Sequence, residues 1–206
     1  MIAIIDSGGA NIASVTFALE RCGATGMLTT DPTVIAKAER VILPGVGAAP
    51  VAMARLREAG LIDCIRSLTQ PVLGICLGMQ LLFERSEEGN TPLLGRIPGV
   101  LDAFTPAPGL SIPHMGWNQL LPRGDGASHP LLAGIKDGAH VYFVHSYAAP
   151  VSDDTLASCS YGEDFTAIVA RDNFMGAQFH PERSGPVGAQ ILQNFLNLVE
   201  SDGPVS

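Results

Sequence analysis

Residues 72–80 read VLGICLGMQ, an apolar strand pattern that runs directly into a helical pattern. The apolar run at residues 72–75 is short and continuous, which is typical of a strand buried on both faces. Cys76 stands at the junction, with Gly74 and Gly78 close on either side. A side chain on such a sharp turn is lifted above the strand ends, and the glycines avoid Cβ clashes. The stretch therefore predicts a parallel sheet with Cys76 at its carboxyl edge.

The rest of the first half repeats this alternation. Apolar strand patterns at residues 2–5 and 40–43 precede helical patterns at 12–22 and about 48–58, and the helical pattern after Cys76 extends over 77–85. Strands that alternate with helices in this way form a parallel sheet with helices on both faces.

The second half changes character, with short β-like pieces within the proline-rich residues 97–111. Further strand candidates lie at residues 141–144, 157–161, 165–169 and 175–179. A last helix is expected to open near Pro186, a favoured first helical residue. Its predicted buried side consists of Val187, Ile191, Phe195 and Leu198. We expect a mixed sheet with antiparallel edge strands, in one α/β domain over residues 1–206 with a core at about 2–199.

Composition limits the classes of partner. The chain has 206 residues, 47% of them apolar, and a formal net charge of −8. This balance argues against a nucleic acid or an anionic membrane as the main partner. The four cysteines form no CxxC pair, the start lacks a signal-peptide pattern, and no apolar run approaches the roughly 20 residues that span a bilayer. These features predict a soluble, cytoplasmic protein.

A second motif, QFHPE at residues 178–182, follows a predicted strand. Residues two apart in an extended chain face the same side, so His180 and Glu182 are expected to project together. With Cys76 they would supply a nucleophile, a base and an orienting acid. Taken singly, Cys76 could be a small buried residue, His180 a strand-end histidine with one hydrogen bond, and Glu182 an exposed charge. The combination favours catalysis.

A third motif is the glycine-rich turn LPGVG at residues 43–47. The N–H groups of Val46 and Gly47, together with that of Leu77, are candidates for binding an oxyanion near Cys76. The alternative is an ordinary strand-to-helix loop. No GxxxxGK[ST] pattern is present, so nucleotide binding is set aside.

Several motifs resemble a known family. GICLGMQ at residues 74–80 and QFHPE at 178–182 resemble the two signatures of the class I (triad) glutamine amidotransferases. PHMGWN at 113–118, YFVHSY at 142–147 and PERSG at 181–185 are similar to the glutaminase subunits of imidazole glycerol phosphate synthases. The resemblance runs from residue 2 to about 198. It implies a flavodoxin-like fold with a central, mostly parallel sheet.

The resemblance also implies roles for individual residues. Cys76 would be the nucleophile, His180 the general base and acid, and Glu182 its orienter. The turn with Val46 and Gly47 would be the oxyanion strand, with at least one N–H turned away in the free protein. The implied glutamine contacts are Gln80, Ser146 and Tyr147. The alternatives for these three are a solvated helix glutamine and a serine–tyrosine pair that packs on the sheet.

The implied reaction is hydrolysis of glutamine through a Cys76 thioester, without cofactor or metal. Its ammonia would pass to a cyclase subunit of (β/α)₈ barrel fold, in a heterodimer that makes imidazole glycerol phosphate and AICAR for histidine biosynthesis. The implied interface residues are Asn11, Trp117, Tyr142 and Arg183. For Trp117, core packing is an equally weighted alternative.

Two departures from the family pattern fall near the implied interface. The opening motif is DSGGAN at residues 6–11, where the family often has DYGxGN, and Arg183 replaces a frequent lysine. Three other functions stay open: a glutaminase for another synthase, such as that of pyridoxal phosphate or GMP, a non-catalytic binding subunit, or another thiol hydrolase. The remaining histidines show no metal-ligand spacing.

Overall fold

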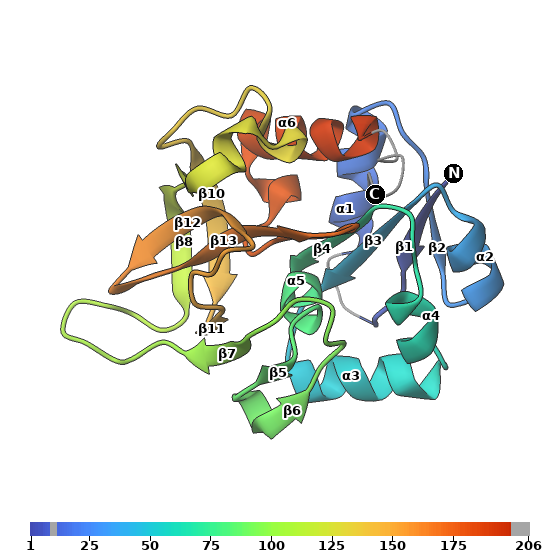
Figure 1. Ribbon diagram of the computed structural model, residues 1–206, viewed down its shortest axis with the longest axis horizontal. Coiled ribbons are helices and arrows are strands. Elements are labelled where there is room, and N and C mark those ends of the chain that lie inside the picture. The colour runs from blue at the N-terminus through green and yellow to red at the C-terminus, as the bar shows by residue number, and fades with distance from the viewer. Residues whose placement is uncertain (9–11, 199–206) are drawn as a thin grey trace, which may run out of the picture.

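The computed structural model describes residues 1–8 and 12–198. An eight-stranded sheet runs through the molecule in the order β2-β1-β3-β4-β14-β13-β12-β9 (Figure 1). The first five of these strands run parallel to one another, whereas β13, β12 and β9 each run antiparallel to the strand before them in this order. The predicted mixed sheet with antiparallel edge strands is confirmed.

The large sheet contains eight strands with the following bounds: β1 Ile2–Ile5, β2 Gly26–Thr29, β3 Arg40–Gly45, β4 Val72–Cys76, β9 Leu121–Pro122, β12 Thr155–Tyr161, β13 Glu163–Arg171 and β14 Phe174–Ala177. Two smaller sheets contain β5 Arg85–Ser86, β6 Thr91–Pro92, β7 Val100–Ala103, β8 His114–Gln119, β10 His140–His145 and β11 Tyr147–Ala148. The helices are α1 Ile12–Arg21, α2 Pro32–Lys37, α3 Ala49–Glu58, α4 Ile62–Arg66, α5 Leu77–Leu81 and α6 Gly185–Asn197.

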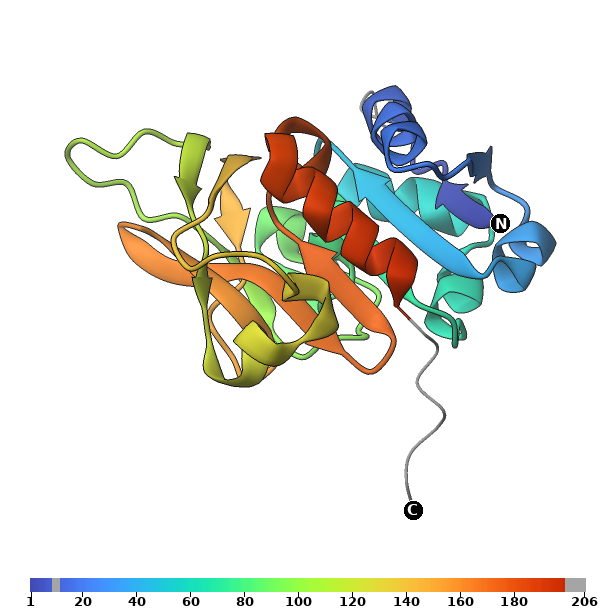
Figure 2. The ribbon, with the colours of Figure 1, turned by 90° about the horizontal axis from the view of Figure 1, so that it is seen from above.

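Helices cover both faces of the large sheet. Alternate residues of a strand point to opposite faces, and β1 divides accordingly. Ile2 and Ile4 belong to the core layer shared with α1 and α6, whereas Ala3 and Ile5 belong to the layer shared with α2, α3 and α4. Figures 1 and 2 show α1 and α6 on one side of the strands and α3 on the other.

Two helical predictions need correction. The helix after Cys76 ends at Leu81 instead of Arg85. The carbonyl groups of Leu81, Leu82 and Phe83 accept hydrogen bonds from residues 94–97 instead of from the next helical turn. On α6 the predicted buried side is confirmed at Ile191 and Phe195, but the other two predicted residues are only partly buried.

Sequence patterns missed several elements, among them β8 and β9 in the second half and β2, α2 and α4 in the first. β2 is an edge strand whose middle residues are exposed, so it carries no buried apolar run. α2 is capped by Asp31, whose carboxylate accepts from the Thr33 N–H at 2.8 Å, and Pro32 opens it. That Asp-Pro pair was a usable start signal. α4, only five residues long, was also missed. Within the described ranges, none of the helices has the length and apolar character to cross a membrane.

Candidate active site

The bend at Cys76 is produced by close contact between β3, β4 and α5. A Cβ on Gly78 would lie 1.7 Å from the Leu43 carbonyl oxygen, and a Cβ on Gly74 would lie 2.6 Å from the Gly78 oxygen. Both positions therefore exclude any side chain. Cys76 has φ +53° and ψ −112°, a backbone conformation that costs a non-glycine residue energy and clusters at functional sites.

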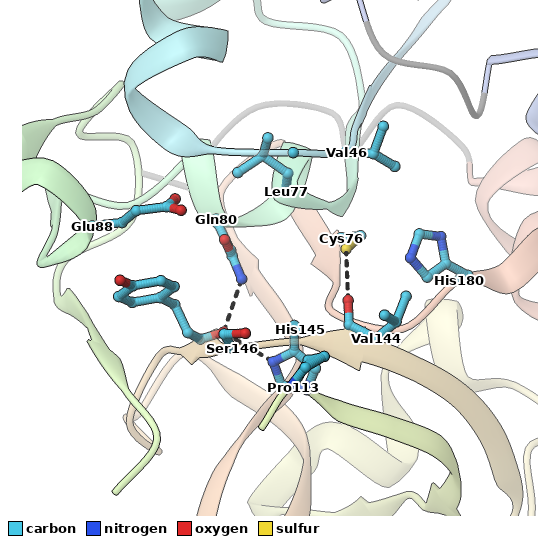
Figure 3. A pocket seen from close by; sticks show the side chains of 12 residues that line it. Val46, Cys76, Leu77, Gln80, Glu88, Pro113, Val144, His145, Ser146 and His180 are labelled. Atoms are coloured by element: carbon cyan, nitrogen blue, oxygen red, sulfur yellow. Dashed lines mark hydrogen bonds between the residues drawn. The ribbon is translucent and has the colours of Figure 1, made fainter. Parts of the chain in front are cut away.

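Cys76 ends β4, and His180 follows β14, the strand beside it. β4 and β14 run parallel, with Ala177 opposite Ile75, so the residues that follow each strand emerge at the same edge of the sheet. Cys76 and His180 both line one cavity of about 300 Å³, and Figure 3 shows their side chains next to each other. The structure thus brings the predicted nucleophile and base together.

Glu182 lies behind His180. The His180 Nδ1 and Glu182 Oε1 atoms are 2.7 Å apart, and the two side chains are 3% and 0% exposed. Burial lowers the pKa of His180, but hydrogen bonds with Cys76 and Glu182 and their charges outweigh it and raise this pKa to about 10. Because Nδ1 faces the carboxylate, Nε2 is the ring nitrogen for the thiol. The carboxylate beside Nδ1 therefore stabilises the protonated, imidazolium form of His180.

His180 is also held through its backbone. Its N–H donates to the Tyr142 carbonyl at 2.9 Å, and the Ser184 hydroxyl donates to the His180 carbonyl at 2.7 Å. Ser184 in turn accepts from the Tyr142 N–H at 3.0 Å. Ser184 is buried and lies within the PERSG segment, but its sequence context predicted no role for it.

The predicted oxyanion and substrate residues line the same cavity. Its wall contains Val46, Gly47, Leu77, Gln80, Ser146 and Tyr147. Gln80 is 6% exposed and donates from Nε2 to the Tyr147 carbonyl at 2.9 Å and to Gln178 Oε1 at 3.0 Å. The solvated alternative for Gln80 is therefore wrong.

Further lining residues were missed by sequence analysis: Glu88, Pro113, Val144 and His145. The Cys76 thiol donates to the Val144 carbonyl, with 3.8 Å between sulfur and oxygen. Glu88 Oε2 accepts from the Ala49 N–H at 2.7 Å, at the start of α3. Figure 3 shows Glu88 beyond Gln80, at the end of the cavity away from His180. Glu88 belongs to no motif, so no sequence signal distinguished it from its acidic neighbours.

Three of the four predicted interface residues, Trp117, Tyr142 and Arg183, lie together on one surface. Trp117 is 56% exposed, so the core alternative for it is wrong. Its ring packs edge-to-face on Tyr142 at 6.0 Å, and the Arg183 guanidinium lies 4.5 Å from the centre of the Tyr142 ring. Met115, 62% exposed, adjoins them on β8. Asn11, the remaining one, lies outside the described residues.

The chain is similar to known proteins over most of its length. The family model described as "Glutamine amidotransferase class-I" matches residues 3–199. A protein of Xanthomonas axonopodis pv. citri named "Imidazole glycerol phosphate synthase subunit HisH" is 57% identical over 197 residues, 96% of this chain and 97% of that protein. A protein of the same name from Shewanella oneidensis is 54% identical, with 96% of each chain covered.

Solved structures share the fold. One described as "Crystal structure of glutamine amidotransferase" has a TM-score of 0.72 at 18% identity and covers 95% of this chain and 96% of its own. Another, described as "Structure of PurLQS from Thermotoga maritima", has a TM-score of 0.68 at 20% identity and covers 95% of this chain and 97% of its own. At these identities the likeness concerns the fold.

Proposed function

The chain belongs to the class-I glutamine amidotransferase family, and on this basis we propose that it is the glutaminase subunit of an imidazole glycerol phosphate synthase. The observation that carries the proposal is the placement of Cys76 and His180 on one cavity, with Glu182 behind His180, in a chain 57% identical to a relative of that name. We take residues 1–206 as one glutamine amidotransferase domain, with a core at about 2–199. The family match over residues 3–199 supports this.

The proposed reaction starts from the Cys76 thiolate and the His180 imidazolium. The sulfur attacks the side-chain amide carbon of glutamine, and the C=O electron pair moves onto oxygen. When the tetrahedral intermediate collapses, His180 gives its proton to the leaving nitrogen, and ammonia departs from a γ-glutamyl thioester. Glu182, 2.7 Å from Nδ1, orients the ring and offsets its charge.

Hydrolysis of the thioester completes the cycle. The imidazole of His180 takes a proton from water, whose oxygen attacks the thioester carbon, and glutamate leaves as the Cys76 thiolate re-forms. The net change is glutamine plus water to glutamate plus ammonia. In both steps the negative oxygen would be held by the Leu77 N–H and by an N–H of Val46 or Gly47. We propose that the latter becomes available only when the partner binds.

The cavity has groups suited to the amino-acid end of glutamine. Glu88 offers a carboxylate to the α-ammonium group at the end of the cavity away from His180. Gln80, Ser146 and Tyr147 line the wall between these ends and would contact the rest of the substrate. A carboxylate at one end and a thiol at the other favour an amino acid over a neutral amide.

The proposed partner is a (β/α)₈ cyclase subunit that docks on the exposed aromatic surface formed by Met115, Trp117, Tyr142 and Arg183. Large aromatic side chains and arginine dominate the binding energy of protein interfaces. Tyr142 lies on this surface, and its carbonyl accepts from the His180 N–H. A docked subunit would thus sit beside the site where ammonia forms.

The test is to assay glutamate release by the protein alone and with a co-expressed cyclase subunit that holds its acceptor ligand. We expect slow release by the protein alone and a large stimulation in the complex. Absence of glutamate release in both would contradict the proposal. Stimulation by the partner of a pyridoxal phosphate or GMP synthase instead would assign the chain to that synthase.

A further inference from the structure

Two buried histidines connect the β8–β10 ribbon to the substrate cavity. His114 and His145 face each other in the register of this antiparallel pair and are 3% and 6% exposed. Their rings join through His114 Nδ1 and His145 Nε2, which are 3.1 Å apart. His145 Nδ1 lies 2.9 Å from the Tyr147 carbonyl oxygen, the same oxygen that accepts from Gln80. The mechanism above uses neither histidine.

These hydrogen bonds form a series from Asn118 to Tyr147, and the groups at its two ends fix the direction of each bond. The Tyr147 carbonyl only accepts, so His145 must carry its proton on Nδ1 and accept at Nε2. His114 must then donate from Nδ1, and its Nε2 accepts from the Asn118 side-chain amide at 3.3 Å. The Asn118 amide is oriented by its own oxygen, which accepts from the Gln119 N–H at 2.8 Å.

The surroundings keep both imidazoles neutral. His114 is stacked between the rings of Phe143 and Tyr161, with centroids 4.9 and 4.0 Å away. His145 packs against Phe104 at 5.1 Å. Burial lowers the pKa of His114 to about 4. Burial lowers the pKa of His145 to about 3, although the hydrogen bond with the Tyr147 carbonyl acts to raise this pKa. A proton added at His145 Nε2 would place its N–H donor opposite the Nδ1–H donor of His114.

We propose that His114 and His145 are positioning residues, which form a hydrogen-bond relay of one fixed direction from Asn118 to the Tyr147 carbonyl. The relay holds this carbonyl, and through it the side chain of Gln80, at the wall of the glutamine cavity. This inference rests on the proposed function only for the identity of the substrate.

The first test is independent of activity. Nitrogen-15 NMR of labelled histidine in the intact chain should place the proton on Nδ1 in both residues, at about pH 6 and at about pH 9. Histidine in water favours the Nε2–H tautomer, so the Nδ1–H tautomer expected at both residues would differ from that of a solvent-exposed histidine. An Nε2–H tautomer at either residue, or protonation within this range, would overturn the relay.

The second test separates positioning from folding, in the complex with the cyclase subunit. His145→Leu removes the donor to Tyr147 and should raise KM for glutamine about tenfold with little change in kcat, as expected for one lost buried hydrogen bond. Partial unfolding would lower kcat instead. His145→Asn retains a donor at the Nδ1 position and should keep KM within about twofold of wild type.

His140→Leu is the matched control, because His140 is an exposed residue on the same strand. It should leave KM unchanged. A wild-type KM in His145→Leu, or a KM in His145→Asn as high as in His145→Leu, would overturn the relay while the proposed function stands. If the wild-type complex released no glutamate, the proposed function would fail, and the tautomer measurement would still decide the relay.

Discussion

Gln178 and Cys76, 102 positions apart in sequence, stand side by side at the carboxyl edge of two parallel strands, with 3.9 Å between the amide nitrogen and the sulfur. This pairing of β14 with β4 explains how the QFHPE motif reaches the cysteine. Two residues beyond Gln178, His180 arrives at the same cavity. The proposed chemistry therefore depends on strand order more than on either motif alone.

Cys76→Ser should lower the rate of glutamate release in the complex by about 10⁴-fold or more, because the serine hydroxyl is a far poorer nucleophile than the thiolate. A glutamine-like electrophile should add once to the wild type, at Cys76, as measured by mass spectrometry of peptides. Cys64→Ser is the matched control, since burial raises the pKa of the Cys64 thiol and this residue lies outside the cavity. Retained turnover in Cys76→Ser would refute the mechanism.

Glu182→Gln should reduce kcat by about 10²- to 10⁴-fold, because the amide orients the His180 ring but cannot offset its charge. Steady-state kinetics of the complex measures this.

The stability difference between wild type and Glu182→Gln should also depend on pH. The pKa of His180 is raised from 6.5 to about 10, so its stabilisation is complete below pH 6.5 and is lost as pH rises through 10. Urea unfolding should therefore show the wild type losing its advantage over Glu182→Gln as pH rises.

Glu163→Gln, at an exposed position on β13, is the control for the loss of one negative charge. It should behave as wild type in both measurements. A stability difference between wild type and Glu182→Gln that widens with rising pH would contradict the assigned origin of the His180 shift.

Gly78→Ala should destabilise the fold by about 4 kcal/mol or more, because its Cβ would meet the Leu43 carbonyl at 1.7 Å and cannot be accommodated without moving the backbone. Gly134→Ala is the comparison: φ is +77° there, but no atom of residues 1–8 and 12–198 lies within 4 Å of the new Cβ. It should cost only about 1–2 kcal/mol. Denaturant unfolding, or soluble yield if Gly78→Ala does not fold, measures both. Equal losses would contradict the close-approach argument.

Glu88→Gln should raise KM for glutamine about tenfold and leave kcat nearly unchanged, because it removes the charge proposed to bind the α-ammonium group. Steady-state kinetics of the complex measures this. Glu87→Gln changes the neighbouring exposed residue, which does not line this cavity, and should leave KM unaltered. If the two variants had the same KM, Glu88 would not be the ammonium site.

Trp117→Ala should weaken binding of the cyclase subunit by about 30-fold or more, as expected for a central aromatic anchor, and leave the melting temperature of the free protein within about 2 °C, because the ring is largely exposed. Isothermal titration calorimetry measures the affinity. Met27→Ala, on the edge strand β2 of the large sheet and 50% exposed, is the control. Unchanged affinity in Trp117→Ala would place the interface elsewhere.

Local patterns were enough for the central strands and the main helices. Three strands, β1, β3 and β4, are continuous apolar runs whose side chains are buried on both faces of the sheet. Their positions were therefore predicted to within two residues. The same signal fails at β2, whose middle residues are exposed. It also fails after Leu81, where hydrogen bonds from residues 94–97 end the helix. These hydrogen bonds join two separate segments, and no local sequence pattern predicts that the two segments come into contact.

The amino-acid sequence is enough to predict the bend at Cys76 and the type of chemistry that a Cys, a His and a Glu in these turns suggest. Backbone sterics and side-chain chemistry are local, and a sequence carries them directly. Tertiary structure alone decided that Trp117 lies outside, that Glu88 reaches the cavity, and that His114 and His145 join into one relay. Each of these depends on strand pairing and burial, which arise only when distant segments pack together.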